Sequence, residues 1–108
     1  MMYKKIKDTL QVIMQGNERI IHDTRTKTTG RKLTKLLDNW HMMWELQKRA
    51  AQTAEEYAFM SAYYNMLTRT ILETITAQNG TLDDMVKFID KFIYLQIKAV
   101  EGVIENEN

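Results

Sequence analysis

The chain has no cysteine, no proline and only four glycines among its 108 residues. Without cysteine it forms neither disulfides nor thiolate metal sites, and we expect it in a reducing compartment, the cytoplasm. No apolar run approaches the roughly 18 residues of a membrane-spanning helix, so we expect no membrane partner. The first five residues, MMYKK, lead into an amphipathic pattern, which predicts that no signal peptide is present.

Residues suited to catalysis or ligand binding are also scarce. Ser61 is the only serine, and on a continuous helix it would lie about 30 Å along the axis from His41. His41 and Glu45 have a spacing compatible with metal ligands, but an ordinary ion pair or hydrogen bond explains them without a metal. The glycines are scattered singly, so no phosphate-binding loop is present. We therefore predict no catalytic residue, no metal and no cofactor.

What the chain does contain is helical periodicity. Apolar residues recur at spacings of three and four over residues 2–23, 31–78 and 82–104, whereas the alternation typical of strands is nowhere sustained. A length of 108 residues suits one domain. The sequence thus predicts a single all-α domain over residues 1–108, with a threonine-rich loop at 24–30 and a frayed tail at 105–108.

The longest pattern covers residues 31–78, which contain neither proline nor glycine. As one helix this segment would be about 72 Å long. Thr53 and Glu56 have the capping-box spacing that begins a helix, but residues 50–52 are good helix formers and would make an unusually short connection. We therefore predict three long antiparallel helices with an extended central helix. The alternative is a compact four-helix bundle in which the central helix breaks near Gln52.

A central helix twice as long as the others would leave half of its apolar stripe uncovered. Because a second copy would cover it, we predict a homo-oligomer, with a dimer as the simplest closed arrangement. The same residues at helical spacing are also typical of a core. The expected interface with a second copy or another protein comprises Leu36, Trp40, Met43, Trp44, Ala50, Ala54, Tyr57 and Tyr64.

Asn17 occupies an apolar position in the first predicted helix. One interpretation is a buried asparagine that sets the register between helices, as in coiled coils. The other is that Gly16 and Asn17 break or fray the helix, because a glycine inside a helix costs about 1 kcal/mol. The sequence leaves both open.

Charge is unevenly distributed along the chain. Residues 1–50 carry eleven Lys/Arg against five Asp/Glu, whereas residues 51–108 carry four against nine. This asymmetry predicts either a basic face for a polyanion or two halves that attract one another within or between chains. Cations at the start of the central helix oppose its dipole, and with free backbone N–H groups they would suit an anion. The candidate anion-binding residues are Arg25, Lys27, Arg31, Lys32 and Lys35.

The leading hypothesis is a non-enzymatic interaction protein, such as an adaptor, an inhibitor or a structural accessory. It would bind another macromolecule, an unidentified protein or a second copy of itself. The alternative hypothesis is a protein that binds nucleic acid or a phosphate ligand through the basic residues at 25–35.

Overall fold

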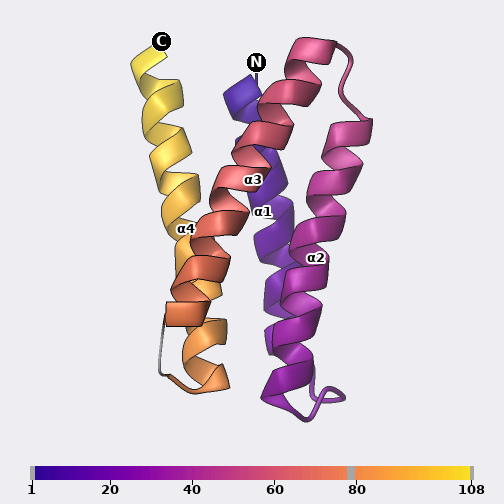
Figure 1. The fold of residues 1–108 in the computed structure, drawn as a ribbon, viewed down its shortest axis with the longest axis vertical. Coiled ribbons are helices and arrows are strands. Elements are labelled where there is room, and N and C mark those ends of the chain that lie inside the picture. The colour runs from indigo at the N-terminus through magenta and orange to yellow at the C-terminus, as the bar shows by residue number, and fades with distance from the viewer. Residues whose placement is uncertain (1, 78–79, 108) are drawn as a thin grey trace.

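The computed structural model describes residues 2–77 and 80–107, and within them four helices form an up-down-up-down bundle (Figure 1). No strand occurs in these residues, so the all-helical prediction is confirmed. None of the helices they contain is long and apolar enough to cross a membrane. In chain order the helices are α1 (Met2–Ile21), α2 (Thr29–Arg49), α3 (Ala54–Ala77) and α4 (Leu82–Glu107).

The predicted central helix is two helices, so the three-helix prediction was wrong and its four-helix alternative describes the fold. The longest dimension is 42 Å, well short of the length that one continuous helix needs. At the end of α2, the Ala50 N–H donates to the Leu46 carbonyl at 3.1 Å. At the start of α3, Thr53 Oγ1 caps the helix by accepting the Glu56 N–H at 3.0 Å. Helix propensities differ by under about 1 kcal/mol per residue, whereas burying a large apolar side chain contributes about 1.5–3 kcal/mol. The free energy gained by burying the apolar stripe between α2 and α3 therefore exceeds the helix propensity that is lost when residues 50–52 leave the helix.

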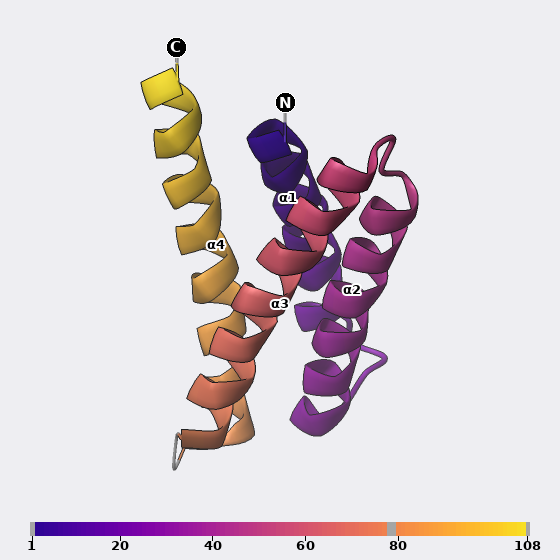
Figure 2. The ribbon, with the colours of Figure 1, turned by 45° about the horizontal axis from the view of Figure 1, so that its top comes forward.

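α1 holds the bundle together, because it packs most extensively against α4 and α2. α3 crosses diagonally in front of the other helices, and it diverges from α4 toward the end that carries both termini (Figures 1 and 2). Contact between α3 and α4 is the least extensive of the helix pairs. The core residues come from all four helices: Ile6, Leu10, Ile13, Trp40, Trp44, Met60, Tyr64, Leu67, Ile71, Ile89, Phe92, Ile93, Ile97 and Val100.

α1 runs without a break through Gly16 and Asn17, and Asn17 is fully buried. Asn39 Nδ2 on α2 donates to Asn17 Oδ1 at 2.9 Å and to the Ile13 carbonyl at 3.1 Å. A Cβ atom at residue 16 would lie 2.8 Å from that same Nδ2, so only glycine permits this approach. Of the two interpretations of Asn17, the structure shows the buried asparagine between helices.

Several helix ends differ from the predicted ones by a few residues. α2 begins at Thr29, inside the predicted loop, because Thr28 Oγ1 caps it by accepting the Arg31 N–H at 3.3 Å. α4 continues to Glu107, so the predicted frayed tail was wrong for residues 105–107, while residue 108 lies outside the described residues. α3 is described as far as Ala77, and its predicted end at residue 78 is likewise outside them.

Candidate functional site

The residues predicted to form an intermolecular interface are divided by the structure. Four of them are at most 9% exposed and belong to the chain's own interior: Leu36, Trp40, Trp44 and Tyr64. The prediction that these four contact a second molecule was therefore wrong, because the break between α2 and α3 folds the stripe back on itself. Met43 is half-buried, and Ala50, Ala54 and Tyr57 are exposed around the α2–α3 connection.

The pair His41 and Glu45 lies at the contact between α2 and α3. His41 Nδ1 is 2.6 Å from the Tyr64 hydroxyl, and Glu45 accepts a hydrogen bond from Lys48 Nζ at 2.7 Å. That hydrogen bond lowers the pKa of Glu45 and raises the pKa of Lys48. The His41 contact therefore joins α2 to α3, whereas the Glu45 contact lies within α2. Residues 2–77 and 80–107 contain no cluster of three His, Cys, Asp or Glu side chains placed to hold a metal.

Two of the predicted anion-binding cations are used inside the chain. Lys32 Nζ donates to the Ile21 carbonyl at 2.7 Å, so it satisfies the carbonyl end of α1. Lys35 Nζ donates to Oγ1 of the buried Thr26, also at 2.7 Å. Their ammonium groups hold the loop after α1 onto the start of α2, which leaves a smaller basic set for a ligand.

The other three predicted cations are exposed around the same loop. Arg25 Nε lies 3.2 Å from Asp23 Oδ1, although the Arg25 side chain is 92% exposed. The Arg25 backbone N–H also donates to Asp23, and these bonds lower the pKa of the Asp23 carboxyl. Lys27 and Arg31 are exposed near the start of α2. These cations do not enclose a pocket with convergent donors among those found in the described residues.

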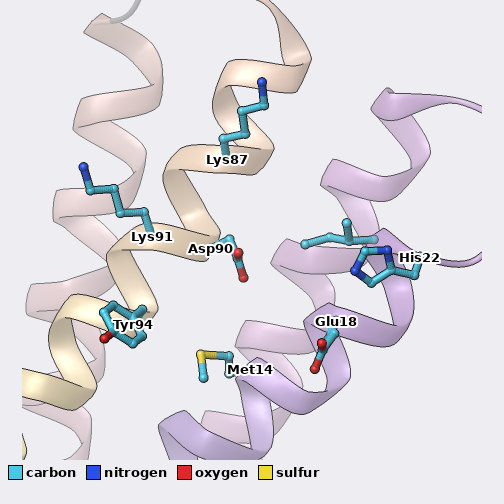
Figure 3. Close-up of a pocket in the computed structure, with 8 residues that line it drawn as sticks. Met14, Glu18, His22, Lys87, Asp90, Lys91 and Tyr94 are labelled. Atoms are coloured by element: carbon cyan, nitrogen blue, oxygen red, sulfur yellow. The ribbon is translucent and has the colours of Figure 1, made fainter.

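A pocket of about 540 Å³ opens between α1 and α4 (Figure 3). Its lining residues are Met14, Glu18, Ile21, His22, Lys87, Asp90, Lys91 and Tyr94. Figure 3 shows Asp90 directed into the gap, whereas Lys91 points away from the α1 side. Acidic and basic groups both line this pocket, so its charge favours neither an anionic nor a cationic ligand. Sequence reasoning missed it because the two helices are far apart in the chain.

The outer face of α1 and α2 carries exposed apolar side chains. Val12 is 50% exposed, Met42 52% and Leu46 51%. We call the outward side of the two helices around these three residues the α1–α2 face. Two pockets lie on it, of about 330 Å³ beside Val12 and Leu46 and about 430 Å³ beside Met42. Met42 and Leu46 were detectable as an i, i+4 pair, but only the packing shows that they point outward.

A second apolar strip lies on the C-terminal half of α4. Leu95, Ala99 and Val103 recur every four residues, so they share one side of the helix. All three are exposed, Leu95 by 50% and Val103 by 37%, and we call them the α4 strip. They are uncovered because α3 diverges from this half of α4 (Figure 2).

Apolar side chains are divided between the interior and the surface of the bundle. Buried apolar contacts form a closed interior, while apolar side chains remain on two outer faces. Such faces gain free energy when another apolar surface removes them from water. No protein-family model matches the chain, and neither curated proteins nor solved structures gave a match.

Proposed function

We propose that this protein is a non-enzymatic helical interaction protein, which acts by binding another protein through its outer helix faces. The observation that supports this is the amount of large apolar side chain left in water. Eleven such side chains in the described residues are 37–55% exposed. Single exposed apolar residues are ordinary on protein surfaces, but those of the α4 strip are arranged in register on one helix side.

The α4 strip fits an amphipathic helix of a partner protein. Anchors spaced by four residues are the pattern by which one helix contacts another lengthwise. The strip extends over about 12 Å, two turns of helix. Ala99 is small, so the backbone of a partner helix can approach α4 closely between Leu95 and Val103. The partner helix would occupy the side of α4 from which α3 diverges.

The alternative function, binding of nucleic acid or a phosphate ligand, has less support. Lys32 and Lys35 donate to groups of this chain, so three of the five candidate cations, Arg25, Lys27 and Arg31, are left for a ligand. Electrostatic binding of that kind weakens steeply with salt. Binding to a nucleic acid that persists at 50 mM salt, falls at about 200 mM and is lost in Arg31→Ala would favour this alternative.

Capture from a lysate of the source organism tests the proposed function. The full chain is compared with Leu95→Glu/Val103→Glu, which places two carboxylates on the α4 strip. The control, Gln52→Glu/Asn65→Asp, adds the same charge at exposed polar positions of the α2–α3 connection and of α3. We expect the wild type and the control to capture the same protein and the strip variant to lose it, with helical circular dichroism unchanged in all three. Capture by the strip variant at the wild-type level, or by none of the chains, contradicts the proposal.

A further inference from the structure

The α1–α2 face has a charge pattern that is complementary to itself. We propose that this face binds a second copy of the same chain, forming a two-fold symmetric dimer in which α2 packs antiparallel on α2 of the second copy. This inference goes beyond the proposed function, because it names the partner and uses a face other than the α4 strip.

The apolar centre of the face consists of Val12, Met42 and Leu46, each about half exposed. Met42 and Leu46 are one helical turn apart on α2, and a shallow pocket joins Leu46 to Val12 on α1. A second copy placed on this centre removes all three side chains from water. Apolar burial is then the source of the affinity.

Charged residues flank that centre in the same way on both helices. α1 carries Asp8 and Arg19, which are eleven residues apart, and α2 carries Asp38 and Arg49 at the same spacing. Eleven residues make about three turns, so each pair lies on one side of its helix, with its members about 16 Å apart. Each helix therefore presents a carboxylate on one side of the apolar centre and a guanidinium on the other.

The two charge pairs share one level in the bundle. The hydrogen bond from Asn39 to Asn17 sets the register of the antiparallel α1 and α2. In that register the midpoint of the α1 pair, between residues 13 and 14, lies beside the midpoint of the α2 pair, between residues 43 and 44. A single two-fold axis across the helices at this level therefore passes through both midpoints.

Rotation about that axis reverses the direction of each helix. Asp8 then faces Arg19 of the second copy, and Asp38 faces Arg49 of the second copy. Met42 of each copy falls beside Leu46 of the other. An axis parallel to the helices would instead place α1 on α2 of the second copy, which separates Met42 from that Leu46.

These four charges are available for contact with another molecule. All are exposed, and none of them has an ion-pair partner among residues 2–77 and 80–107. Three charged residues near the face are engaged within the chain, Lys5 with Glu56, Lys35 with Thr26, and Glu45 with Lys48, whereas Lys4, one turn before Asp8, is exposed. Exposed ion pairs contribute little each, so here they select the orientation of the second copy rather than supply the affinity.

Sedimentation equilibrium of the full chain, from micromolar to millimolar concentration, tests the dimer. Leu46→Glu and Leu95→Glu form a matched pair, because the two leucines are 51% and 50% exposed on different faces. We expect Leu46→Glu to raise the dimer Kd by about 30-fold or more, the effect of an interface hot spot. Leu95→Glu is expected to leave the Kd unchanged. A wild type that is monomeric at millimolar concentration, or equal effects of the two variants, overturns the dimer.

Charge exchange tests the orientation. Asp38→Arg is expected to weaken the dimer by about tenfold, because it places two arginines together at each end of the α2 contact. Adding Arg49→Asp should restore the wild-type Kd, because each end then pairs an arginine with an aspartate again. Restoration by Arg19→Asp in place of Arg49→Asp overturns the antiparallel arrangement. Helical circular dichroism and the thermal midpoint of each variant verify that the chain remains folded, and a variant that loses its fold is replaced by Leu46→Lys and Asp38→Lys.

The two proposals fail separately. A protein that captures its partner through the α4 strip but sediments as a monomer contradicts only the dimer. A protein that dimerises and captures nothing contradicts only the proposed function.

Discussion

α1 and α3 are of similar length, 20 and 24 residues, yet they are held in the bundle in different ways. α1 concentrates its apolar side chains on one stripe, and Ile6, Leu10 and Ile13 are completely buried. α3 has apolar residues around its whole circumference, so Met66 and Leu72 remain at least half exposed. When the apolar residues form one narrow stripe, that side of the helix is the one buried. When they surround the helix, the packing of the neighbouring helices decides which side is buried. The comparison shows that hydrophobic content alone does not decide how firmly a helix is packed.

Directed polar contacts partly compensate for the smaller packing of α3. Trp40 Nε1 on α2 donates to Thr68 Oγ1 on α3 at 2.8 Å. Lys5 on α1 pairs with Glu56 at 2.5 Å, and this is the one ion pair in the described residues that joins residues 1–50 to residues 51–108. The two oppositely charged halves of the chain are therefore held together mainly by packing and not by direct ion pairs.

The largest expected effect is a cavity in the interior, and it differs between the two helices. Leu→Ala substitutions in cores destabilise by about 2–5 kcal/mol, depending on how far the site collapses. Leu10 is completely buried in α1, the most extensively packed helix, so Leu10→Ala is expected near the upper end of that range. Leu67→Ala in α3 is expected near the lower end, because α3 is free to shift into the cavity. Urea denaturation measures both, and equal losses would show that α3 is packed as firmly as α1.

Alanine substitution of two glycines compares a site where two helices are in close contact with a site that has open space around it. Gly16→Ala forces Asn39 away from its acceptors, so we expect it to destabilise the fold by about 1–3 kcal/mol. Gly102→Ala in α4 meets nothing within 4 Å, and we expect a gain of about 0.5–1 kcal/mol from helix propensity. Thermal unfolding of both variants gives the signs. A stabilising Gly16→Ala would contradict the close contact between α1 and α2.

The hydrogen bond between Trp40 and Thr68 is expected to couple α2 to α3 by about 1 kcal/mol. A double-mutant cycle of Trp40→Phe and Thr68→Val isolates that term. Trp44→Phe is the control, because Trp44 Nε1 is buried without a hydrogen-bond partner in the described residues and its loss removes no such bond. Coupling near zero in the first pair would mean that α3 is positioned by packing alone.

The smallest effect is expected at the start of α4, where Thr81 and Asp84 form a capping box. The Thr81 N–H donates to Asp84 Oδ2 at 3.0 Å, and the Asp84 N–H donates to Thr81 Oγ1 at 3.2 Å. The first of these bonds lowers the pKa of the Asp84 carboxyl. A lowered folded-state pKa gives stability that is complete above the unfolded pKa, about 3.9, and is lost as pH falls through the folded value.

Asp84→Asn should therefore reduce the fall in melting temperature between about pH 5 and pH 2. The effect is small because the carboxylate is exposed and screened by solvent. Asp90→Asn, outside the capping box, is the control and should keep the wild-type dependence. An identical pH dependence in the Asp84 variant would show that the cap does not depend on the carboxylate charge.

Local chemistry accounts for the parts of the fold that the sequence predicts well. The Thr53 cap and the capping box of Thr81 and Asp84 act through hydrogen bonds between residues three apart, so their spacing is present in the chain. The sequence favours a continuous helix over a break near Gln52, because residues 50–52 have good helix propensity and the free energy gained by breaking comes from contacts with distant helices. The internal roles of Lys32 and Lys35 were missed for the same reason, since their acceptors are backbone and hydroxyl oxygens that carry no charge signal.

The sequence predicts the spacing of the residues that form the candidate surfaces, but not where those residues lie in the fold. The spacing of Asp8 with Arg19, and of Asp38 with Arg49, is present in the sequence. Whether the two pairs lie side by side depends on the register between α1 and α2, which the Gly16 and Asn39 contact sets. The exposure of the α4 strip depends on the path of α3, which no local pattern specifies.

The amino-acid sequence by itself determined that the chain is helical, where α1 and α4 begin, and which residues are apolar. These properties follow from backbone propensity and hydrogen bonds within a few residues. Only the tertiary structure decided that the longest apolar stripe folds back on itself and which apolar residues remain outside. The reason is that burial is a property of neighbouring helices, and the free energy it contributes exceeds the local preference of three good helix formers.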